Sequence, residues 1–219
     1  MILLIDTSQE TATAALAADG LVMFSEENKN AREHASWLHM AIGRLTSLAG
    51  ISIRDLKAVS VIAGPGSYTG LRVGMAAAKG FCYALKIPLI TLNTLRVMAE
   101  SMKELAMEKK ALICPMMDAR REEVFTAIYQ ADMQEIMAPR ALILDKNAFE
   151  GPLSAYRIIF SGSGAAKWKN ICTSSPALFE PQNNIIQSFA MLSQEGFSSK
   201  SWADPVYSEP VYLKEFFSY

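Results

Sequence analysis

The chain has 219 residues, of which 51% are hydrophobic, and a net charge of -1 from 21 basic and 22 acidic side chains. This length allows a large core, in one domain or in two smaller lobes. The balanced charge gives no excess of basic side chains for binding a phosphate backbone, so it argues against unaided RNA binding. Three scattered cysteines predict neither disulfides nor a zinc site, and the lack of a leader or membrane span predicts a cytoplasmic protein.

The first half of the chain has the pattern of an α/β unit. Short apolar runs predict strands at residues 1–5, 11–16 and 21–24, with a tight turn at Asp19-Gly20 between the last two. Apolar residues at helical spacing predict a helix over residues 34–49, and Ser52 with Asp55 predicts a capping box. Three further elements follow: a strand at 58–62, a helix at 71–85 and a strand at 88–92.

The second half repeats the opening of the first. After a charged helix predicted at 96–110, one fixed offset places Asp118 on Asp6 and Glu122 on Glu10, each between two strands. We therefore predict duplicated lobes, the first over 1–100 and a smaller second one over 101–219. The remaining expectations are a strand at 157–160, helices at 165–170 and 183–195, and an extended tail over 205–217 that can return to the first lobe.

A glycine loop connects the strand at 58–62 to the next helix. Two interpretations stay open: a tight connection without a ligand, or backbone amides that hold an anion at the helix N-terminus. The loop lacks the Walker pattern and misses the dinucleotide spacing by one position. Its residues are Gly64, Pro65, Gly66, Ser67, Tyr68, Thr69 and Gly70.

Other residues define a possible vestigial nucleotide site. They lie after the first strand and in the corresponding second-lobe loop: Asp6, Thr7, Ser8, Gly162 and Gly164. We expect Asp6 to accept hydrogen bonds from turn amides rather than to bind a metal, and Arg120 to neutralise Asp118.

Metal and hydrolase chemistry have little support. The two histidines, His34 and His39, lie about 140° apart on an ideal helix, too far around it to share a metal. Ser67 and Ser163 have glycine neighbours, but neither completes a nucleophile motif with a downstream histidine. We therefore predict no catalytic residue and no metal site.

The two first-lobe helices are candidates for docking another protein. The second carries small side chains that allow another helix to approach closely, whereas the first carries bulky ones. Packing against their own sheet is the competing interpretation for most of these positions. The candidate interface residues are Trp37, Met40, Ala41, Arg44, Leu48, Met75, Ala76, Ala77, Lys79 and Gly80.

Several segments together resemble the TsaB (YeaZ) family, whose members are needed to make threonylcarbamoyladenosine on tRNA. The matching segments span nearly the whole chain and are residues 5–8, 64–74, 78–80, 118–120, 123–124 and 210–213. The resemblance implies an α/β, two-lobed actin-like ATPase (ASKHA, ribonuclease H-like) fold with duplicated lobes, the second one reduced.

The resemblance also implies a role and a set of partners. The catalytic relative, TsaD, carries two metal-binding histidines where this chain has Thr94 and Met98. We therefore expect a non-catalytic scaffold that pairs its two helices with a TsaD-type subunit, joined by a TsaE-type P-loop ATPase. The same helices can support a homodimer. We expect tRNA to be reached only through the complex, no cofactor bound by the chain itself, and ATP or ADP, where bound, held by the complex.

A second hypothesis assigns the chain to another class of protein. A nucleotide-dependent small-molecule kinase or carbamoyltransferase of the same fold would bind nucleotide between its lobes, and its support is Asp6, the glycine loop and the loop at residues 161–164. The missing glycines after Asp6 and the missing D-G-G-x-T pattern in the second lobe argue against it.

Overall fold

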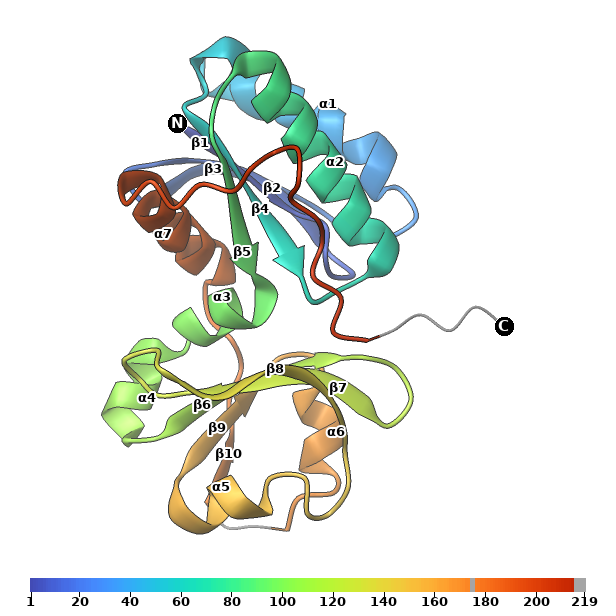
Figure 1. The fold of residues 1–219 in the computed structure, drawn as a ribbon, viewed down its shortest axis with the longest axis vertical. Coiled ribbons are helices and arrows are strands. Elements are labelled where there is room, and N and C mark those ends of the chain that lie inside the picture. The colour runs from blue at the N-terminus through green and yellow to red at the C-terminus, as the bar shows by residue number, and fades with distance from the viewer. Residues whose placement is uncertain (174–175, 215–219) are drawn as a thin grey trace. The chain divides into compact units, whose positions relative to one another are not determined.

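The computed structural model describes residues 1–173 and 176–214. Figure 1 shows the chain, which packs as two units. The first contains Met1–Thr94 and Ile186–Tyr212, and the second begins at Leu95 and includes Leu213. The boundary between the units lies at residues 94–95, before the predicted position at residue 100, because the helix that begins at Thr94 packs Leu95 and Met98 into the core of the second unit.

The first unit is built on a five-stranded mixed sheet in the order β3-β2-β1-β4-β5. Strand β1 pairs antiparallel with β2 and parallel with β4, so the sheet changes direction beside β1. The strands are β1 (Ile2–Asp6), β2 (Ala12–Ala18), β3 (Leu21–Asn28), β4 (Ala58–Gly64) and β5 (Leu89–Asn93).

Helices cover both faces of this sheet, as Figure 1 shows. Helices α1 (His34–Leu48) and α2 (Tyr68–Leu85) pack over one face, where Leu3, Ile5 and Val61 contribute to the core. Helix α7 (Ile185–Ser198) covers the other face, and its Ser193 donates a buried hydrogen bond to Ser60 of β4 at 2.8 Å. The central strands β1 and β4 are therefore buried on two sides, which explains their continuous apolar runs, whereas the edge strand β3 alternates exposed and half-buried residues.

The predicted elements of this unit are present with shifted ends. The capping box is confirmed at the short helix η1 (Ile53–Asp55), where the Asp55 carboxylate accepts from the Ser52 amide at 2.8 Å. Helix α2 begins earlier than predicted, at Tyr68, because Ser67 caps it. Helix α7 was expected at 183–195 and spans Ile185–Ser198. Residues 186–212 pack with the first unit, although in sequence they come after residues 95–185 of the second unit.

The second unit repeats this topology with its sheet in the order β10-β9-β6-β7-β8. Here β6 pairs antiparallel with β7 and parallel with β9, as β1 does with β2 and β4. The strands are β6 (Leu112–Asp118), β7 (Glu123–Tyr129), β8 (Glu135–Ile143), β9 (Ile158–Ser161) and β10 (Ala177–Phe179). The matching strand orders confirm the two-lobed, duplicated fold.

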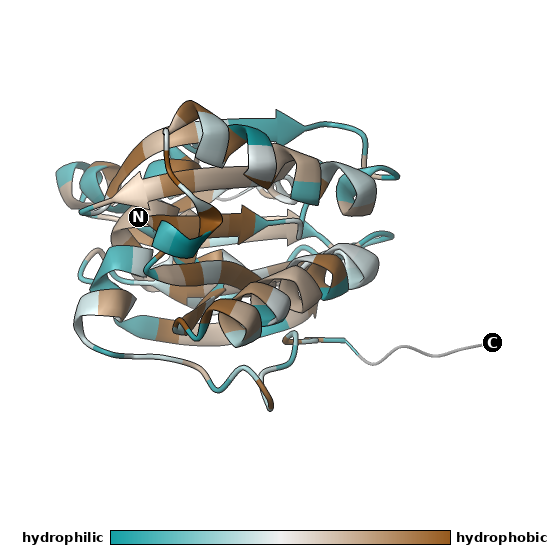
Figure 2. Cartoon of the chain, turned by 90° about the horizontal axis from the view of Figure 1, so that it is seen from above, coloured by the Kyte–Doolittle hydropathy of each residue, from teal (hydrophilic) through white to brown (hydrophobic). Residues whose placement is uncertain are grey.

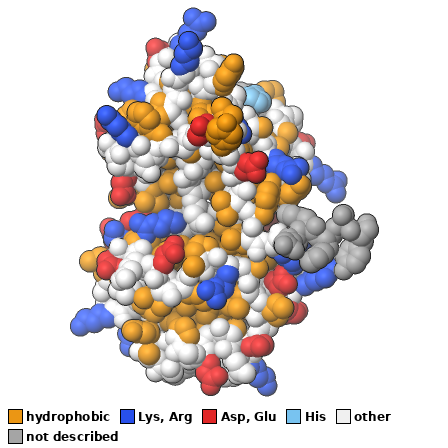
Figure 3. Space-filling model, viewed as in Figure 1, with side chains coloured by type: hydrophobic (Ala, Val, Ile, Leu, Met, Phe, Trp, Pro, Cys, Tyr) orange, Lys and Arg blue, Asp and Glu red, His pale blue; other side chains and the backbone are white. Residues whose placement is uncertain are grey.

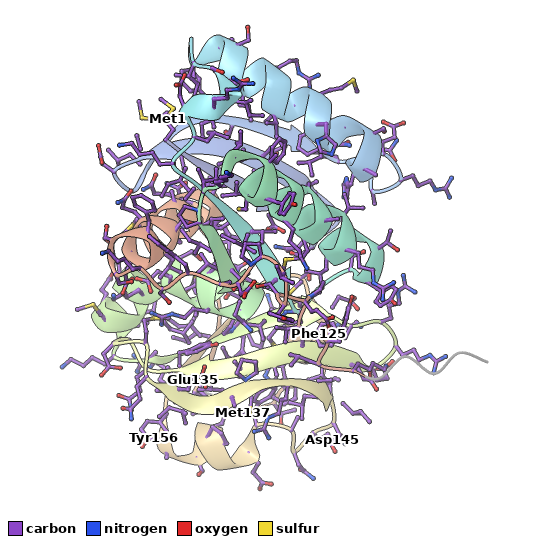
Figure 4. All side chains as sticks on the ribbon, turned by 45° about the horizontal axis from the view of Figure 1, so that its top comes forward. Met1, Phe125, Glu135, Met137, Asp145 and Tyr156 are labelled. Atoms are coloured by element: carbon purple, nitrogen blue, oxygen red, sulfur yellow. The ribbon has the colours of Figure 1, made fainter. Side chains whose placement is uncertain are left out.

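Alternation along β6 and β7 gives the second sheet two apolar faces. Ile113 and Met117 pack with helices α3 (Thr94–Glu100) and α4 (Lys103–Lys109) on one face. Phe149 and Trp168 pack on the other, with helices α5 (Glu150–Ala155) and α6 (Ala165–Lys169). In Figure 4, the labelled Phe125 and Met137 project from the neighbouring strands β7 and β8 of this sheet, and they belong to the two different cores.

Some sequence predictions for this unit were incomplete. The helix expected at 96–110 is two helices, because the Ser101 hydroxyl donates to the Met98 carbonyl at 2.7 Å and the chain turns there. Helix α5 and strand β10 were not predicted. Of the expected tail, Glu215, Phe216 and Phe217 lie outside the described residues.

Most strands are coloured as apolar in Figure 2, whereas the helices carry apolar and polar residues in turn. Among the residues described, none of the helices has the length and apolar character that a bilayer crossing requires. Basic and acidic side chains are interspersed on the face drawn in Figure 3, in agreement with the balanced net charge.

Candidate docking surface and the closed glycine loop

The glycine loop lies directly against the turn that follows β1. The Ser67 amide donates to the Ser8 carbonyl at 2.7 Å. A Cβ at Gly66 would lie 2.5 Å from the same carbonyl oxygen, and one at Gly70 would collide with the Thr7 carbonyl. Glycine is therefore required at both positions because two backbone segments touch.

Thr7 fixes the first turns of α2 to this loop. Its side chain is buried, and its hydroxyl donates to the Gly70 carbonyl at 2.6 Å. A Cβ at Gly74 would lie 2.5 Å from the same hydroxyl oxygen, so α2 rests on Thr7 for more than one turn. The Gly70 amide has the Ser67 hydroxyl as its acceptor at 3.3 Å. These loop amides already have partners, and the geometry favours a tight connection over an anion site.

Asp6 has the environment of a turn-forming carboxylate. Its Oδ1 accepts from the Ser8 amide at 2.8 Å and from the Ser8 hydroxyl at 2.6 Å. Burial raises the pKa of Asp6 above its usual range, although these hydrogen bonds act in the opposite direction. A carboxylate that resists ionisation and is occupied by its own turn is a poor ligand for a cation.

Asp118 occupies the equivalent place in the second unit but carries a different partner. Its Oδ1 accepts from the Arg120 amide at 2.6 Å and from the Lys167 ammonium at 2.7 Å. Burial is the largest influence and would by itself raise the pKa of Asp118, but the hydrogen bonds from Lys167 and the Arg120 amide, together with the positive charges of both side chains, outweigh it and lower the net pKa. Lys167, which the sequence analysis missed, makes the ion pair that was expected of Arg120. The sequence feature that could have identified Lys167 is its position in the helix that follows the loop at residues 161–164.

The second-lobe glycines are also explained by packing within their unit. Gly162 has a φ of +98°, and a Cβ there would collide with the Met116 carbonyl. A Cβ at Gly164 would lie 2.8 Å from Val124. Beside Gly162 lies a shallow pocket of about 340 Å³, whose floor includes Phe160 and Phe179. Among the described residues, no group of three or more His, Cys, Asp or Glu side chains could hold a metal ion.

Thr94 and Met98, the residues that the resemblance aligns with two histidines of TsaD, make internal contacts. The Thr94 hydroxyl is buried and donates to the Pro65 carbonyl of the glycine loop at 2.5 Å. Met98 is buried in the second core. Two of the three cysteines are poor nucleophiles, since burial raises the pKa of Cys82 to about 11 and that of Cys114 to about 12.

The structure divides the ten candidate interface residues into two groups. Ala41, Met75 and Ala77 are buried in the first core, because they face the sheet, and they cannot contact a partner. The exposed and half-buried residues of α1 and α2 remain as the candidate docking surface, called the docking surface below. They are Trp37, Met40, Arg44, Leu48, Ala76, Lys79 and Gly80, with the newly found Gly43.

Two of these residues already have partners within the chain. The Arg44 guanidinium pairs with both carboxylate oxygens of Glu26 in β3, with the closest approach at 2.6 Å. The Lys79 ammonium donates to the carbonyls of Val206 and Ser208. Both cations therefore shape the borders of the docking surface.

Gly43 and Gly80 are the most informative members of the docking surface. Each lies in a helix interior, where glycine costs roughly 1 kcal/mol relative to alanine. At both positions an added Cβ would meet nothing within 4 Å. Within residues 1–173 and 176–214, no contact accounts for either glycine, in contrast to Gly66, Gly70 and Gly74. Gly43 was missed in the sequence because one glycine in a helix has no distinctive spacing.

Comparison with known proteins places the chain in a family. The model for TsaD, described as tRNA N6-adenosine threonylcarbamoyltransferase, matches residues 26–200. The tRNA threonylcarbamoyladenosine biosynthesis protein TsaB of Escherichia coli is 35% identical over 133 residues, which cover 60% of this chain and 55% of that protein. TsaB of Bacillus subtilis is 33% identical over 129 residues, or 59% and 55% of the two chains. The chain thus spans about half the length of the curated relatives it matches.

Solved structures share the fold over most of the chain. YeaZ from Pseudomonas aeruginosa superposes with a TM-score of 0.79 at 23% identity, covering 97% of this chain and 99% of that one. An inorganic polyphosphate/ATP-glucomannokinase from Arthrobacter superposes with a TM-score of 0.52 at 10% identity, covering 89% and 98%. These likenesses agree with a two-lobed actin-like fold. From its sequence motifs, its fold and the family model, the chain belongs to the TsaB (YeaZ) group of the TsaD-like family.

Proposed function

We propose that this chain is a non-catalytic scaffold or activator subunit in the formation of threonylcarbamoyladenosine, at the adenosine next to the anticodon of tRNA. It acts by docking α1 and α2 onto a TsaD-type catalytic subunit. The observation that carries this proposal is the pair of helix-interior glycines, Gly43 and Gly80, that open into empty space on exposed helix faces. Small residues at such positions allow the backbone of another helix to approach closely.

The resemblance aligns Thr94 and Met98 with the two metal-binding histidines of TsaD, and the contacts of both residues support a non-catalytic role. Thr94 and Met98 are engaged in packing, and neither side chain can replace imidazole as a metal ligand. Asp6 is occupied by the amide and hydroxyl of Ser8 in its own turn, and the glycine loop is occupied by Thr7 and Ser8. We therefore assign the metal and the transfer chemistry to the partner.

The wider assembly follows from the same assignment. A TsaE-type ATPase completes it, ATP or ADP is held by the complex, and tRNA is reached only through the complex. A cytoplasmic location follows from the tRNA substrate. In the absence of the partner, two copies of the chain can use the same helices to form a homodimer.

A binding measurement with the purified partner tests the proposal. Ala76 is exposed on α2, so Ala76→Asp places a charge on the docking surface and leaves the core intact. We expect this variant to lose the complex and to keep its circular dichroism spectrum. Ala155→Asp, at an exposed position of α5, is the matched control and should bind normally. Normal binding by Ala76→Asp would contradict the proposed surface.

The kinase alternative has one favourable observation, the pocket beside Gly162. Calorimetry of the isolated chain with magnesium nucleotide separates the two functions. The scaffold assignment predicts no micromolar binding, whereas a kinase requires it.

A further inference from the structure

The C-terminal segment over residues 203–212, here called the strap, runs along α2 in the first unit. Figure 1 shows it as the red stretch beside that helix. The Ala203 amide donates to the Leu89 carbonyl at 2.8 Å, just beyond the C-terminal end of α2. The Val211 amide donates to the Ala63 carbonyl at 2.7 Å, near the N-terminal end of α2. The strap is therefore antiparallel to α2 and anchored at both of its ends.

Lys79 anchors the middle of the strap. Its ammonium donates to the Val206 carbonyl at 3.2 Å and to the Ser208 carbonyl at 3.0 Å. The strap holds its own turn through Asp204, whose carboxylate accepts from the Val206 amide at 2.7 Å. An ammonium group has three donors, and two of them are engaged here. Lys79 thus fixes the distance between α2 and the strap.

Aromatic and cationic groups hold the other end. The Tyr212 ring lies 5.2 Å from that of Tyr68, and its hydroxyl accepts from Arg72 at 3.1 Å. A Cβ at Gly64, which has a φ of +119°, would lie 2.5 Å from the Val211 carbonyl oxygen. Glycine at position 64 therefore leaves room for the backbone of the strap at Val211. The first residue of the glycine loop and the tail motif at residues 210–213 therefore belong to one contact.

Helix geometry places the strap at the border of the docking surface. At 100° per residue, Arg72 lies about 20° from Lys79 around α2, whereas Ala76 and Gly80 lie about 60° and 100° away. Phe81 lies about 200° away, and its ring is 5.7 Å from that of His39 on α1. The exposed small residues of α2 are therefore flanked by α1 on one side and by the strap on the other.

The strap also carries exposed apolar side chains at its anchored centre. Val206 is 68% exposed and Tyr207 is 81% exposed, next to the carbonyl that Lys79 holds. Two adjacent large side chains held in place at the edge of a docking surface are suited to a protein contact, in which tyrosine is enriched.

We infer that the strap forms the border of the docking surface on the side of α2 opposite α1, and that Val206 and Tyr207 contact the same partner subunit that binds to α2. This inference rests on the proposed function. Lys79 then acts as a positioning residue, because it holds the strap rather than touching the partner through its ammonium group. The partner meets three elements of this chain: α1, α2 and the strap.

Affinity measurements with the TsaD-type subunit test this inference. The double variant Val206→Ser/Tyr207→Ser should raise the dissociation constant at least ~10-fold, as loss of an interface tyrosine commonly does. Its melting temperature should stay close to that of the unmodified chain, since both side chains are exposed. Met191→Ser, at a residue of α7 that is 51% exposed, is the matched control and should bind normally.

A second variant tests the anchor. Lys79→Met keeps the apolar stem but removes both hydrogen bonds, so hydrogen exchange over 203–212 should accelerate and affinity should fall. Unchanged affinity of the double variant, with loss of binding in Ala76→Asp, would overturn the strap inference and leave the docking proposal standing. Failure of the unmodified chain to bind the partner would overturn both.

Discussion

Replacing Gly80 with alanine should change stability and binding in opposite directions. Alanine is favoured over glycine in a helix interior by about 1 kcal/mol, and the added methyl group meets nothing within 4 Å in this chain. The free energy of unfolding should therefore rise by ~1 kcal/mol, which corresponds to a melting temperature higher by roughly 2–4 °C. In a complex, the methyl group would enter a tightly packed helix contact, where overpacking costs about 1–3 kcal/mol.

The assay combines calorimetric melting of the free chain with titration of the TsaD-type subunit. An overpacking cost of that size corresponds to a roughly 5- to 150-fold weaker complex. Gly151→Ala is the control, since Gly151 is also open on a helix and lies in α5, which is not part of the docking surface. The control should bind normally and gain less stability, because Gly151 lies in the first turn of its helix. A Gly80→Ala variant that is more stable and binds with unchanged affinity would refute the reasoning.

Three further predictions concern the loop and the two turn aspartates. Gly70→Ala should lower the free energy of unfolding by about 3 kcal/mol in denaturant titration, because its methyl group collides with the Thr7 carbonyl; an unchanged midpoint would contradict this. The raised pKa of Asp6 means that the folded chain binds the proton more tightly than the unfolded chain, so the contribution of Asp6 to stability falls as pH rises above the usual pKa of an aspartate. Asp6→Asn should therefore stabilise the fold at neutral pH, with a gain that shrinks toward acidic pH in thermal melts. Lys167→Met should lower the free energy of unfolding by about 1 kcal/mol at neutral pH, because it removes the ion pair with Asp118. The loss should be smaller below the lowered pKa of Asp118, where this carboxyl is protonated in the folded and the unfolded chain alike. An equal loss in strong acid would count against the ion pair.

The sequence predicted the fold well where local signals and burial agree. The offset between Asp6 and Asp118 predicted the duplication, and both residues end strands at the same place in matching sheets. The apolar stripe of α1 and the capping box at Ser52 are likewise local patterns. Such features depend on neighbours in sequence, so one sequence is enough to find them.

The candidate site was less predictable because it depends on contacts between distant segments. Sequence could not divide α2 into residues that face the sheet, such as Ala77, and residues that face solvent, such as Ala76. The partners of Lys79 lie more than one hundred positions away in sequence. Lys167 was missed for the same reason, since its contact with Asp118 joins α6 to the end of β6.

The order in which the chain is synthesised gives the strap and α7 a further consequence. Both belong to the first unit, yet they leave the ribosome only after residues 95–185 of the second unit have been made. Until then, the sheet of the first unit lacks the cover of α7 over one apolar face and the strap beside α2. A nascent chain stalled after residue 94 would therefore expose strand surface that the finished protein buries, and would be a natural client for a chaperone.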